Sequence, residues 1–478
     1  MRILFVTSEV SRLYKLGGLG DVSRSLPVAL EKLRVKVVVA MPYYRNIKLN
    51  KVRGVGQIAV DFDGARELVF IFQSILPGSN NVPVYLFRHP MLDDYHAGDI
   101  VEKFAFYSSA VARAIEYAPD AVGGKPDIVH CHDWHTGLVP LLLGERNKLR
   151  REKETLESIR TKTIVTIHNL LYQGTAPASL IKKLNLPKHI FHILPEKSGD
   201  TIKLFREGLE HADIISTVSP TYAKEILTGD YGQHVNDVLR RRQASVVGIL
   251  NGIDEGSWDT RHDEFLSVQY GESDVIPGKQ ANKEYLQRIL KLPVSKVPLI
   301  GFVGRLEVRQ KGIDILIEAL GRLLPDGMQM VILGQGPKKI KQTLSEFEKK
   351  FPEHFKFIPT FDERLARRIY AGADILTVPS KFEPCGLTQM IAMRYGTIPL
   401  VRKTGGLADS VTDGSTGFVF EAYNGSALLS KLKEAITLWN EQPHKWQRMV
   451  TRCLRADFSW TVSAKKYKAL YKKLLSGS

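Results

Sequence analysis

The amino-acid sequence predicts an α/β protein made of two doubly wound domains. Apolar runs rich in β-branched residues alternate with helical patterns along the chain, which is typical of parallel sheets covered by helices on both faces. A chain of 478 residues is long for one core and fits two. One glycine-containing phrase also occurs once in each half. We therefore expect two Rossmann-like domains facing one cleft.

The repeated phrase reads Lys-x-Gly-Gly-Leu-x-Asp. It spans residues 15–21 and again residues 403–409, and each copy follows an apolar, strand-like run. Glycine lets the backbone approach a ligand closely, and free N–H groups at a helix start favour negative charge. Each copy therefore predicts a site for a phosphate or a sugar.

The first domain is predicted over residues 1–247. Its strands are expected at 2–8, 35–41, 56–61, 67–73, 82–87, 127–131, 162–167 and 213–218. Its helices are expected at 20–33, 101–117, 135–147 and 203–210. The turn signal Asn251-Gly252, just after a strand-like run, places the crossover to the next domain near residues 245–250.

The second domain is predicted over residues 248–459. Its strands are expected near 245–250, 298–304, 328–333, 355–358, 374–378, 397–401 and 417–420. Its helices are expected near 279–291, 311–323, 337–349, 363–371, 386–394 and 425–440. Residues 464–475 form an amphipathic helical pattern at the end of the chain.

Composition limits the functional classes. The net charge of +16 indicates either an anionic partner or a solvated basic surface. No nucleic-acid motif and no apolar run long enough to span a membrane is evident, so neither partner is expected. No signal or transit peptide is recognisable, and three cysteines are too few for a disulfide framework. These features predict a cytoplasmic protein.

A carboxylate-bearing loop is the first candidate site. Residues 379–387 follow a strand-like run and precede a helical one, so Glu383 is expected beyond the carboxyl end of a strand, where doubly wound folds bind ligands. Such a carboxylate suits sugar hydroxyls or positive charge at a sugar carbon, although an acid there also commonly caps a helix.

Two cations follow another predicted strand. Arg305 offers a bidentate fork for phosphate oxygens and Lys311 a compact charge, so together they suit a departing diphosphate. Ordinary surface cations are the alternative interpretation.

The cluster His130-Cys131-His132-Asp133-Trp134-His135 resembles a metal site. Adjacent strand residues point to opposite faces, and no second ligand pair at zinc-site spacing exists. We interpret Asp133 and His135 as a polar wall of a cleft, and His168 in the same way. The Asp-x-Asp pattern at 61–63 is interpreted as a turn, so no metal is predicted.

Taken in order, these motifs resemble those of the bacterial glycogen synthase and plant starch synthase family over nearly the whole chain. They are joined by Asn251-Gly252-Ile253-Asp254, by Gln310-Lys311-Gly312 and by residues 368–374. The resemblance implies the two-domain GT-B glycosyltransferase fold, with the C-terminal helix at 460–478 returning to the first domain. It also implies retaining transfer of glucose from ADP-glucose to the non-reducing end of an α-1,4-glucan such as glycogen, without a cofactor.

The resemblance also assigns roles to residues. Those implied as catalytic are Glu383, Arg305, Lys311, His168 and Asp21. Those implied in donor binding are Lys15, Gly18, Asn251, Phe361, Cys385, Gly386, Leu387, Thr404, Gly405 and Gly406, with Phe361 at a position that stacks on adenine. Those implied on the donor or acceptor wall are Tyr95, Asp133 and Trp134.

The expected chemistry is front-face transfer, in which the leaving phosphate helps to deprotonate the acceptor hydroxyl. Preorganised cations and N–H groups stabilise the separating charges better than a lone base does. Two features depart from the family pattern. One extra residue separates Arg305 from Lys311, and Lys103 stands in a shortened stretch where the family has Arg.

Three alternatives remain open. The first is a UDP-glucose-preferring enzyme, or a GT-B glucosyltransferase with another acceptor. The second is a catalytically silent glucan-binding homologue, against which the intact set of Lys15, Arg305, Lys311 and Glu383 argues. The third is an oxidoreductase, which is disfavoured because the first loop lacks G-x-G-x-x-G and no acid ends the second strand.

Overall fold

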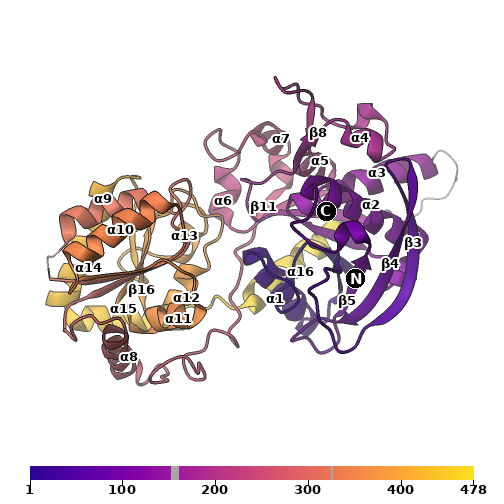
Figure 1. Cartoon of the computed structure of the whole chain (residues 1–478). Coiled ribbons are helices and arrows are strands. Elements are labelled where there is room, and N and C mark those ends of the chain that lie inside the picture. The colour runs from indigo at the N-terminus through magenta and orange to yellow at the C-terminus, as the bar shows by residue number, and fades with distance from the viewer. Residues whose placement is uncertain (152–160, 325–326, 478) are drawn as a thin grey trace. The chain divides into compact units, whose positions relative to one another are not determined.

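The computed structural model describes residues 1–151, 161–324 and 327–477, so residues 152–160, 325–326 and 478 of the predicted domains lie outside the described residues (Figure 1). The chain divides into two compact units. The first comprises Met1–Val218, Ala223–Ile249 and Trp460–Ser478, and the second Ser219–Tyr222 and Leu250–Ser459. The main division follows Ile249, two residues beyond the predicted boundary.

The first unit contains a nine-stranded sheet in the order β11-β10-β7-β6-β1-β2-β5-β4-β3 within its described residues. Its strands are β1 (Arg2–Val6), β2 (Lys36–Pro42), β3 (Arg53–Phe62), β4 (Ala65–Ile75), β5 (Pro83–Arg88), β6 (Ile128–His132), β7 (Lys162–Ile167), β10 (Ile214–Thr217) and β11 (Val246–Gly248). The short strands β8 (Thr175–Pro177) and β9 (Thr201–Lys203), which the sequence patterns did not predict, pair separately.

The expectation of a fully parallel first sheet is wrong at one edge. Strand β4 runs antiparallel to both β3 and β5. Only Asp63 and Gly64 connect β3 to β4, both with positive φ, which is a hairpin turn. Parallel strands need a crossover of a dozen or more residues, so this link cannot join a parallel pair.

Helices cover both faces of the first sheet. The two helices α1 (Gly18–Lys32) and α16 (Trp460–Ser476) pack against each other, and Tyr467 and Tyr471 of α16 enter the same core as Phe5 and Leu26. The end of the chain therefore completes the first unit. The other helices of this part of the chain are α2 (Ile100–Tyr117), α3 (Leu138–Arg151), α4 (Leu180–Lys183), α5 (Leu204–His211), α6 (Pro220–Glu225) and α7 (Asn236–Arg241).

The second unit contains a parallel sheet in the order β14-β13-β12-β15-β16-β17. Its strands are β12 (Leu299–Val303), β13 (Gln329–Leu333), β14 (Phe355–Ile358), β15 (Ile375–Val378), β16 (Ile398–Arg402) and β17 (Phe418–Phe420). Its helices are α8 (Val275–Ile289), α9 (Ile313–Leu323), α10 (Lys338–Lys350), α11 (Glu363–Gly372), α12 (Thr388–Arg394), α13 (Gly405–Ser410), α14 (Gly425–Glu441) and α15 (Pro443–Arg455).

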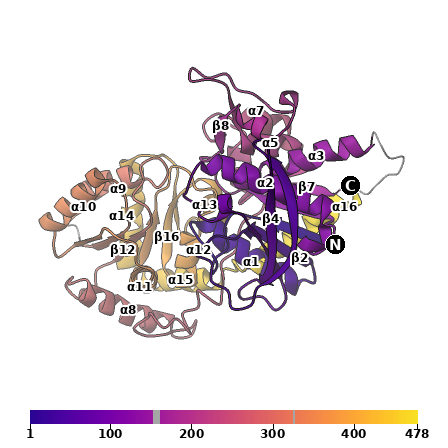
Figure 2. The same cartoon turned by 45° about the vertical axis from the view of Figure 1, so that its right-hand side comes forward.

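Figure 2 shows helices on both faces of this second sheet. Helix α9 packs with α14, whereas α8 packs with α11 and α15 with α12. The sequence patterns did not predict α15, although its buried residues Trp446, Met449, Val450 and Cys453 have helical spacing. In the described part of the chain, no helix combines the length and apolar character needed to cross a membrane.

Candidate functional site

The predicted site residues lie where the strand order of each sheet reverses. In the second unit the reversal falls between β12 and β15, which lead directly into the loops of Arg305 and Glu383. In the first unit it falls between β1 and β6, which lead into the loops of Lys15 and Asp133. Doubly wound sheets bind ligands at this position. Each unit thus presents its own half-site.

A buried carboxylate organises the glycine loop of the first unit. The backbone N–H groups of Leu16 and Gly17 both donate to Oε2 of Glu9, the second at 3.0 Å. Burial raises the pKa of Glu9 above its usual value. Glu9 therefore occupies the two N–H groups that immediately precede α1. Gly18, which begins α1, is exposed.

Two charged side chains of this loop, Lys15 and Asp21, form an ion pair at the surface. Nζ of Lys15 pairs with Asp21 at 2.7 Å, and both side chains are partly exposed. The second copy of the phrase uses its matching residues differently. Lys403 pairs with Glu421 at 2.7 Å, and Asp409 accepts hydrogen bonds from the backbone and hydroxyl of Thr221. The two copies share a sequence pattern but have different side-chain partners.

Asp133 is buried at the end of β6. Its Oδ1 accepts the backbone N–H of His168 at 2.7 Å, so the ends of β6 and β7 are joined. Burial raises the pKa of Asp133 to about 7. Its φ of +54° is uncommon for a residue other than glycine, and such backbone conformations concentrate at functional sites.

His168 is held by a second histidine. Its Nε2 lies 2.9 Å from Nδ1 of His132, whose ring stacks on Phe5 with 3.8 Å between centroids. Burial lowers the pKa of His168 to about 3, so the ring is neutral near pH 7. His132 thus fixes which nitrogen of His168 remains for a ligand.

The predicted acceptor wall is built from stacked rings. The hydroxyl of Tyr95 lies 2.8 Å from Nε2 of His135, and Trp134 stacks on the His135 ring at 4.0 Å. Trp134 is itself buried. Lys103 is buried below this loop and donates to the backbone carbonyls of residues 94, 95 and 97. The residue that departs from the family pattern therefore supports Tyr95.

Hydrogen bonds within the protein occupy the other histidine of the cluster. Nδ1 of His130 lies 2.8 Å from the hydroxyl of Tyr471, and its Nε2 lies 2.6 Å from the hydroxyl of Thr166. Both ring nitrogens are thus engaged. Within residues 1–151, 161–324 and 327–477, no group of three or more His, Cys, Asp or Glu side chains is arranged to hold a metal ion.

In the second unit, Lys311 and Glu383 meet. Nζ of Lys311 lies 2.7 Å from Oε2 of Glu383, and the hydroxyl of Ser380 donates to the same oxygen at 2.9 Å. Glu383 is buried, whereas Lys311 keeps about a fifth of its side chain exposed. The arrangement places an ammonium and a carboxylate side by side at the strand edge.

The extra residue before Lys311 is accommodated in a turn. The N–H of Lys311 donates to the carbonyl of Glu307 at 2.8 Å, which closes the turn. Gly312 follows with a φ of +69°, and a Cβ there would lie 2.0 Å from the carbonyl oxygen of Pro379. Only glycine allows this approach, which brings Lys311 to the Glu383 loop. Arg305 remains more than half exposed.

The second glycine loop packs directly on the Glu383 loop. The N–H of Gly406 donates to the carbonyl of Glu383 at 3.0 Å, and a Cβ on Gly406 would lie 1.9 Å from the carbonyl oxygen of Cys385. The amide of Gln389 supports the same loop through the carbonyl of Gly386 at 2.6 Å. The structure therefore brings the predicted donor residues together, namely Lys311, Glu383, Cys385, Gly386, Leu387, Thr404, Gly405 and Gly406.

Asn251 joins this group through a long loop. Its backbone hydrogen bonds with the thiol of Cys385, and its side chain is buried. In the described part of the chain, Oδ1 of Asn251 has no hydrogen-bond partner. A buried amide oxygen of this kind is poised to accept a hydrogen bond from a ligand.

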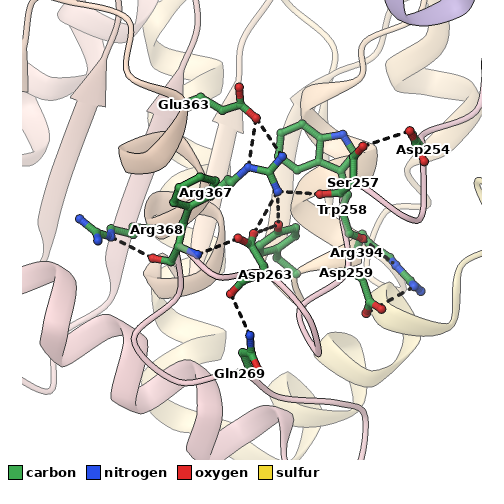
Figure 3. Close-up of polar contacts among 12 residues, drawn as sticks. Asp254, Ser257, Trp258, Asp259, Asp263, Gln269, Glu363, Arg367, Arg368 and Arg394 are labelled. Atoms are coloured by element: carbon green, nitrogen blue, oxygen red, sulfur yellow. Dashed lines mark hydrogen bonds and ion pairs between the residues drawn. The ribbon is translucent and has the colours of Figure 1, made fainter. Parts of the chain in front are cut away.

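The loop that follows Asn251 is anchored by a buried ion pair (Figure 3). Arg367 of α11 donates to Asp263 at 3.1 Å and to the carbonyl of Ser257 at 2.6 Å, and its guanidinium lies over the ring of Trp258. The hydroxyl of Tyr395 also donates to Asp263. These contacts hold the loop on the body of the second unit.

Phe361 stands apart from the other predicted donor residues. Its ring is 70% exposed in the loop between β14 and α11. Two residues earlier, Pro359 lines a cavity of about 510 Å³ that Arg305 also lines. The cavity continues along residues 335–337, after β13. An exposed aromatic ring beside a cation-lined cavity suits a nucleotide.

Sequence reasoning did not assign a site role to four residues that shape these half-sites. They are Glu9, Lys103, His132 and Gln335. The sequence could have identified Gln335, because Gly334-Gln335-Gly336-Pro337 is a glycine-containing loop that follows a strand, as the other ligand loops do. Glu9 and His132 had none, since their roles depend on contacts with other segments.

Comparisons with known proteins agree with this geometry. Residues 2–241 match the family model described as starch synthase catalytic domain, and residues 287–451 match glycosyl transferases group 1. Glycogen synthases of Moorella thermoacetica and Thioalkalivibrio sulfidiphilus are each 40% identical, covering 99% and 100% of this chain and 97% and 100% of their own lengths.

Solved structures show the same relationship. The catalytic domain of starch synthase IV from Arabidopsis thaliana, bound to ADP and acarbose, is 32% identical with a TM-score of 0.87, and 99% of each chain is covered. A sucrose-phosphate synthase from Thermosynechococcus elongatus, 18% identical with a TM-score of 0.59 over the full length of both chains, shares the fold alone.

Proposed function

The chain belongs to the glycogen and starch synthase family, and from that membership we propose that it transfers glucose from ADP-glucose to the non-reducing end of an α-1,4-glucan. It is a glycogen synthase with the GT-B fold. The proposal adds the donor nucleotide, retention at the anomeric carbon and the release of ADP. A starch synthase bound to ADP and acarbose supports the adenine nucleotide and, because acarbose is a glucan analogue, the glucan acceptor.

The observation that carries the proposal is the contact of Lys311 with Glu383 at the strand reversal of the second unit. Lys311 supplies positive charge for the diphosphate, and exposed Arg305 supplies a second cation beside the 510 Å³ cavity. The cavity takes the nucleoside, with the adenine on Phe361. The loop of Thr404, Gly405 and Gly406 binds the distal phosphate.

The glucosyl ring is assigned to the loop of Glu383 and to Asn251. The unpartnered Oδ1 of Asn251 accepts a sugar hydroxyl, and residues 385–387 contact the ring. From the first unit we assign His168 and Asp21 to the same sugar, and Lys15 and Gly18 to the phosphates. Tyr95, Asp133 and Trp134 form or support the donor and acceptor wall.

The chemistry follows from charge. As the bond between the anomeric carbon and the phosphate oxygen lengthens, the sugar becomes cationic and the diphosphate becomes more anionic. Lys311 and Arg305 stabilise the anion, while Glu383 stabilises the sugar. Glu383 is bound by an ammonium and a hydroxyl, which lowers its nucleophilicity and favours an electrostatic role. The departing phosphate takes the proton of the acceptor hydroxyl on the same face.

We further propose that this transfer needs no metal ion, because Arg305 and Lys311 supply the charge that a metal would otherwise provide at the diphosphate. We also propose a cytoplasmic location. The three cysteines are buried as free thiols, which suits a reducing compartment.

The experiment is nucleotide release with glycogen as acceptor, with ADP-glucose and UDP-glucose compared in the presence of EDTA. We expect fast ADP release that requires both glycogen and ADP-glucose and is unaffected by EDTA. Faster release from UDP-glucose would overturn the donor assignment. No release from either donor would favour the silent glucan-binding alternative, and loss of activity with EDTA would overturn the metal-free mechanism.

A further inference from the structure

A groove in the second unit lies away from the residues assigned to glucosyl transfer. It is formed by the start of α8 and one side of α15, and its volume is about 590 Å³. We call it the α8–α15 groove. Its walls combine apolar residues of α8 with polar residues of α15, and the argument rests mainly on Glu272, Ile276, Arg448, Arg452 and Arg455.

Helix α15 carries uncompensated positive charge. It contains one lysine and three arginines and no acidic residue. Arg448 and Arg452 lie one turn apart on the same side of the helix, and both are exposed. Like charges at this spacing destabilise a helix by a few tenths of a kcal/mol. A bound anion would remove that cost.

Only one arginine of the groove has a carboxylate partner among the described residues. Arg455 pairs with Glu272 at 2.5 Å, which neutralises that end of the groove. Arg448 and Arg452 form no ion pair within the described parts of the chain. They therefore present two guanidinium groups, and Gln447 and Thr451 add polar side chains to the same wall.

The facing wall has matching properties. Helix α8 is 15 residues long, and its first turn lines the groove. The side chain of Asp274 at its start does not cap the helix but accepts the N–H of Gly271. The positive end of α8 thus adds to the field of the arginines. Ile276, which is 37% exposed, provides an apolar surface beside them.

We propose that the α8–α15 groove binds a small phosphate-bearing molecule, with the phosphate between Arg448 and Arg452. Guanidinium groups bind phosphate oxygens in bidentate fashion, and the volume lies in the range of small-ligand sites. The body of a phosphate ester would lie on Ile276.

The test is isothermal titration calorimetry on the full chain at constant ionic strength. Inorganic phosphate and glycerol 3-phosphate are the probes, and any binding that the arginine variant retains in full is assigned to the donor site. Arg448→Gln/Arg452→Gln removes the two guanidinium groups. Lys433→Gln/Lys445→Gln is the matched control, because it removes two exposed charges from α14 and α15 outside the groove.

We expect saturable binding to the parent and the lysine control, and at least tenfold weaker binding to the arginine variant. Glycerol 3-phosphate binding more tightly than inorganic phosphate would assign the site to esters, and equal affinity would assign it to free phosphate. The arginine variant should keep the parental melting temperature and basal glucan synthesis. Equal binding to all three proteins, or no saturable binding to any, would overturn the proposal. Poly(U) binding through the same arginines without binding of either probe would also overturn it.

Discussion

Nζ of Lys311 lies 2.7 Å from Oε2 of Glu383, although 72 residues separate them in the chain. The two side chains neutralise each other in the absence of substrate. A bound diphosphate would share the ammonium with Glu383, which also keeps its hydrogen bond from Ser380. The pair therefore couples phosphate binding to the charge at the glucosyl ring.

Lys311→Ala should lower kcat by on the order of a hundredfold or more, because the ammonium stabilises charge that develops in the transition state. Lys311→Arg should recover part of the activity, since it keeps the charge but not the geometry. ADP release from ADP-glucose measures both. The double variant Lys311→Ala/Glu383→Ala should lower kcat by less than the product of the two single fold-changes, because the two residues act as a unit.

Lys431→Gln is the control for charge. Lys431 of α14 also pairs with a glutamate, Glu434, at 2.8 Å, but it lies outside the residues assigned to the donor. Its turnover should remain parental. Near-parental turnover of Lys311→Ala would show that the leaving-group assignment is wrong.

Glu9→Ala should impair the first glycine loop. Removing the carboxylate leaves the N–H groups of Leu16 and Gly17 without their acceptor, and Lys15 loses its support. We expect kcat/KM for ADP-glucose to fall by roughly ten- to a hundredfold, as for a displaced positioning group. Glu9→Gln keeps an acceptor oxygen of the same reach and should retain more activity. Equal activity of both variants and the parent would remove Glu9 from the site.

Phe361→Ala should raise the KM for ADP-glucose by about tenfold, because an aromatic ring stacked on a base contributes roughly 1–3 kcal/mol. The value of kcat should change little, since the adenine is distant from the reacting bond. Phe361→Tyr should behave as the parent. The ring is 70% exposed, so the melting temperature is expected to stay constant in both variants. A fall in kcat without a change in KM would contradict adenine stacking.

Local patterns predict much of this molecule because its ligand loops follow strands. Glycine and charged residues after an apolar run located Lys15, Arg305 and Glu383 at strand ends, and the structure places them there. The antiparallel edge was predictable in principle, since Asp63-Gly64 is a hairpin signal. The support given by Glu9 was not, because an acid that accepts loop N–H groups looks in sequence like any surface acid.

Four histidines around the ends of β6 and β7 give the protein a pH-dependent stability. Removal from water lowers their pKa values, to about 3 for His130, His135 and His168 and well below the usual value for His132. The unfolded chain binds protons on these rings below about pH 6.5, whereas the folded chain does not. Their contribution is therefore complete above pH 6.5 and is lost as the pH falls.

Three carboxyl groups act in the opposite direction. Burial raises the pKa of Asp133 and of Glu207 to about 7 and also raises the pKa of Glu9, so the folded chain keeps carboxyl protons that the unfolded chain releases above about pH 4.5. Four histidine protons minus two or three carboxyl protons leave one or two more protons on the unfolded chain. The free energy of unfolding should thus fall by up to about 3 kcal/mol per pH unit between pH 6.5 and 4.5.

Urea unfolding at several pH values measures this slope. His130→Asn should reduce the pH dependence of the free energy of unfolding by the contribution of about one proton. His262→Asn changes an exposed ring and should leave this pH dependence unchanged. A slope of the opposite sign would show that the carboxyl groups dominate.

The last prediction concerns the stability that the ion pair of Arg367 and Asp263 gives to the second unit. Arg367 and Asp263 are both buried, and the loop that begins at Asn251 depends on them. Arg367→Met leaves the Asp263 carboxylate without its cation, and breaking such a pair costs about 3–5 kcal/mol. Asp263→Asn with Arg367→Met should be less destabilised than Arg367→Met alone, because the buried charge is gone. If urea unfolding gave the two variants equal stability, the cost would come from lost packing on Trp258 and not from the unpaired charge.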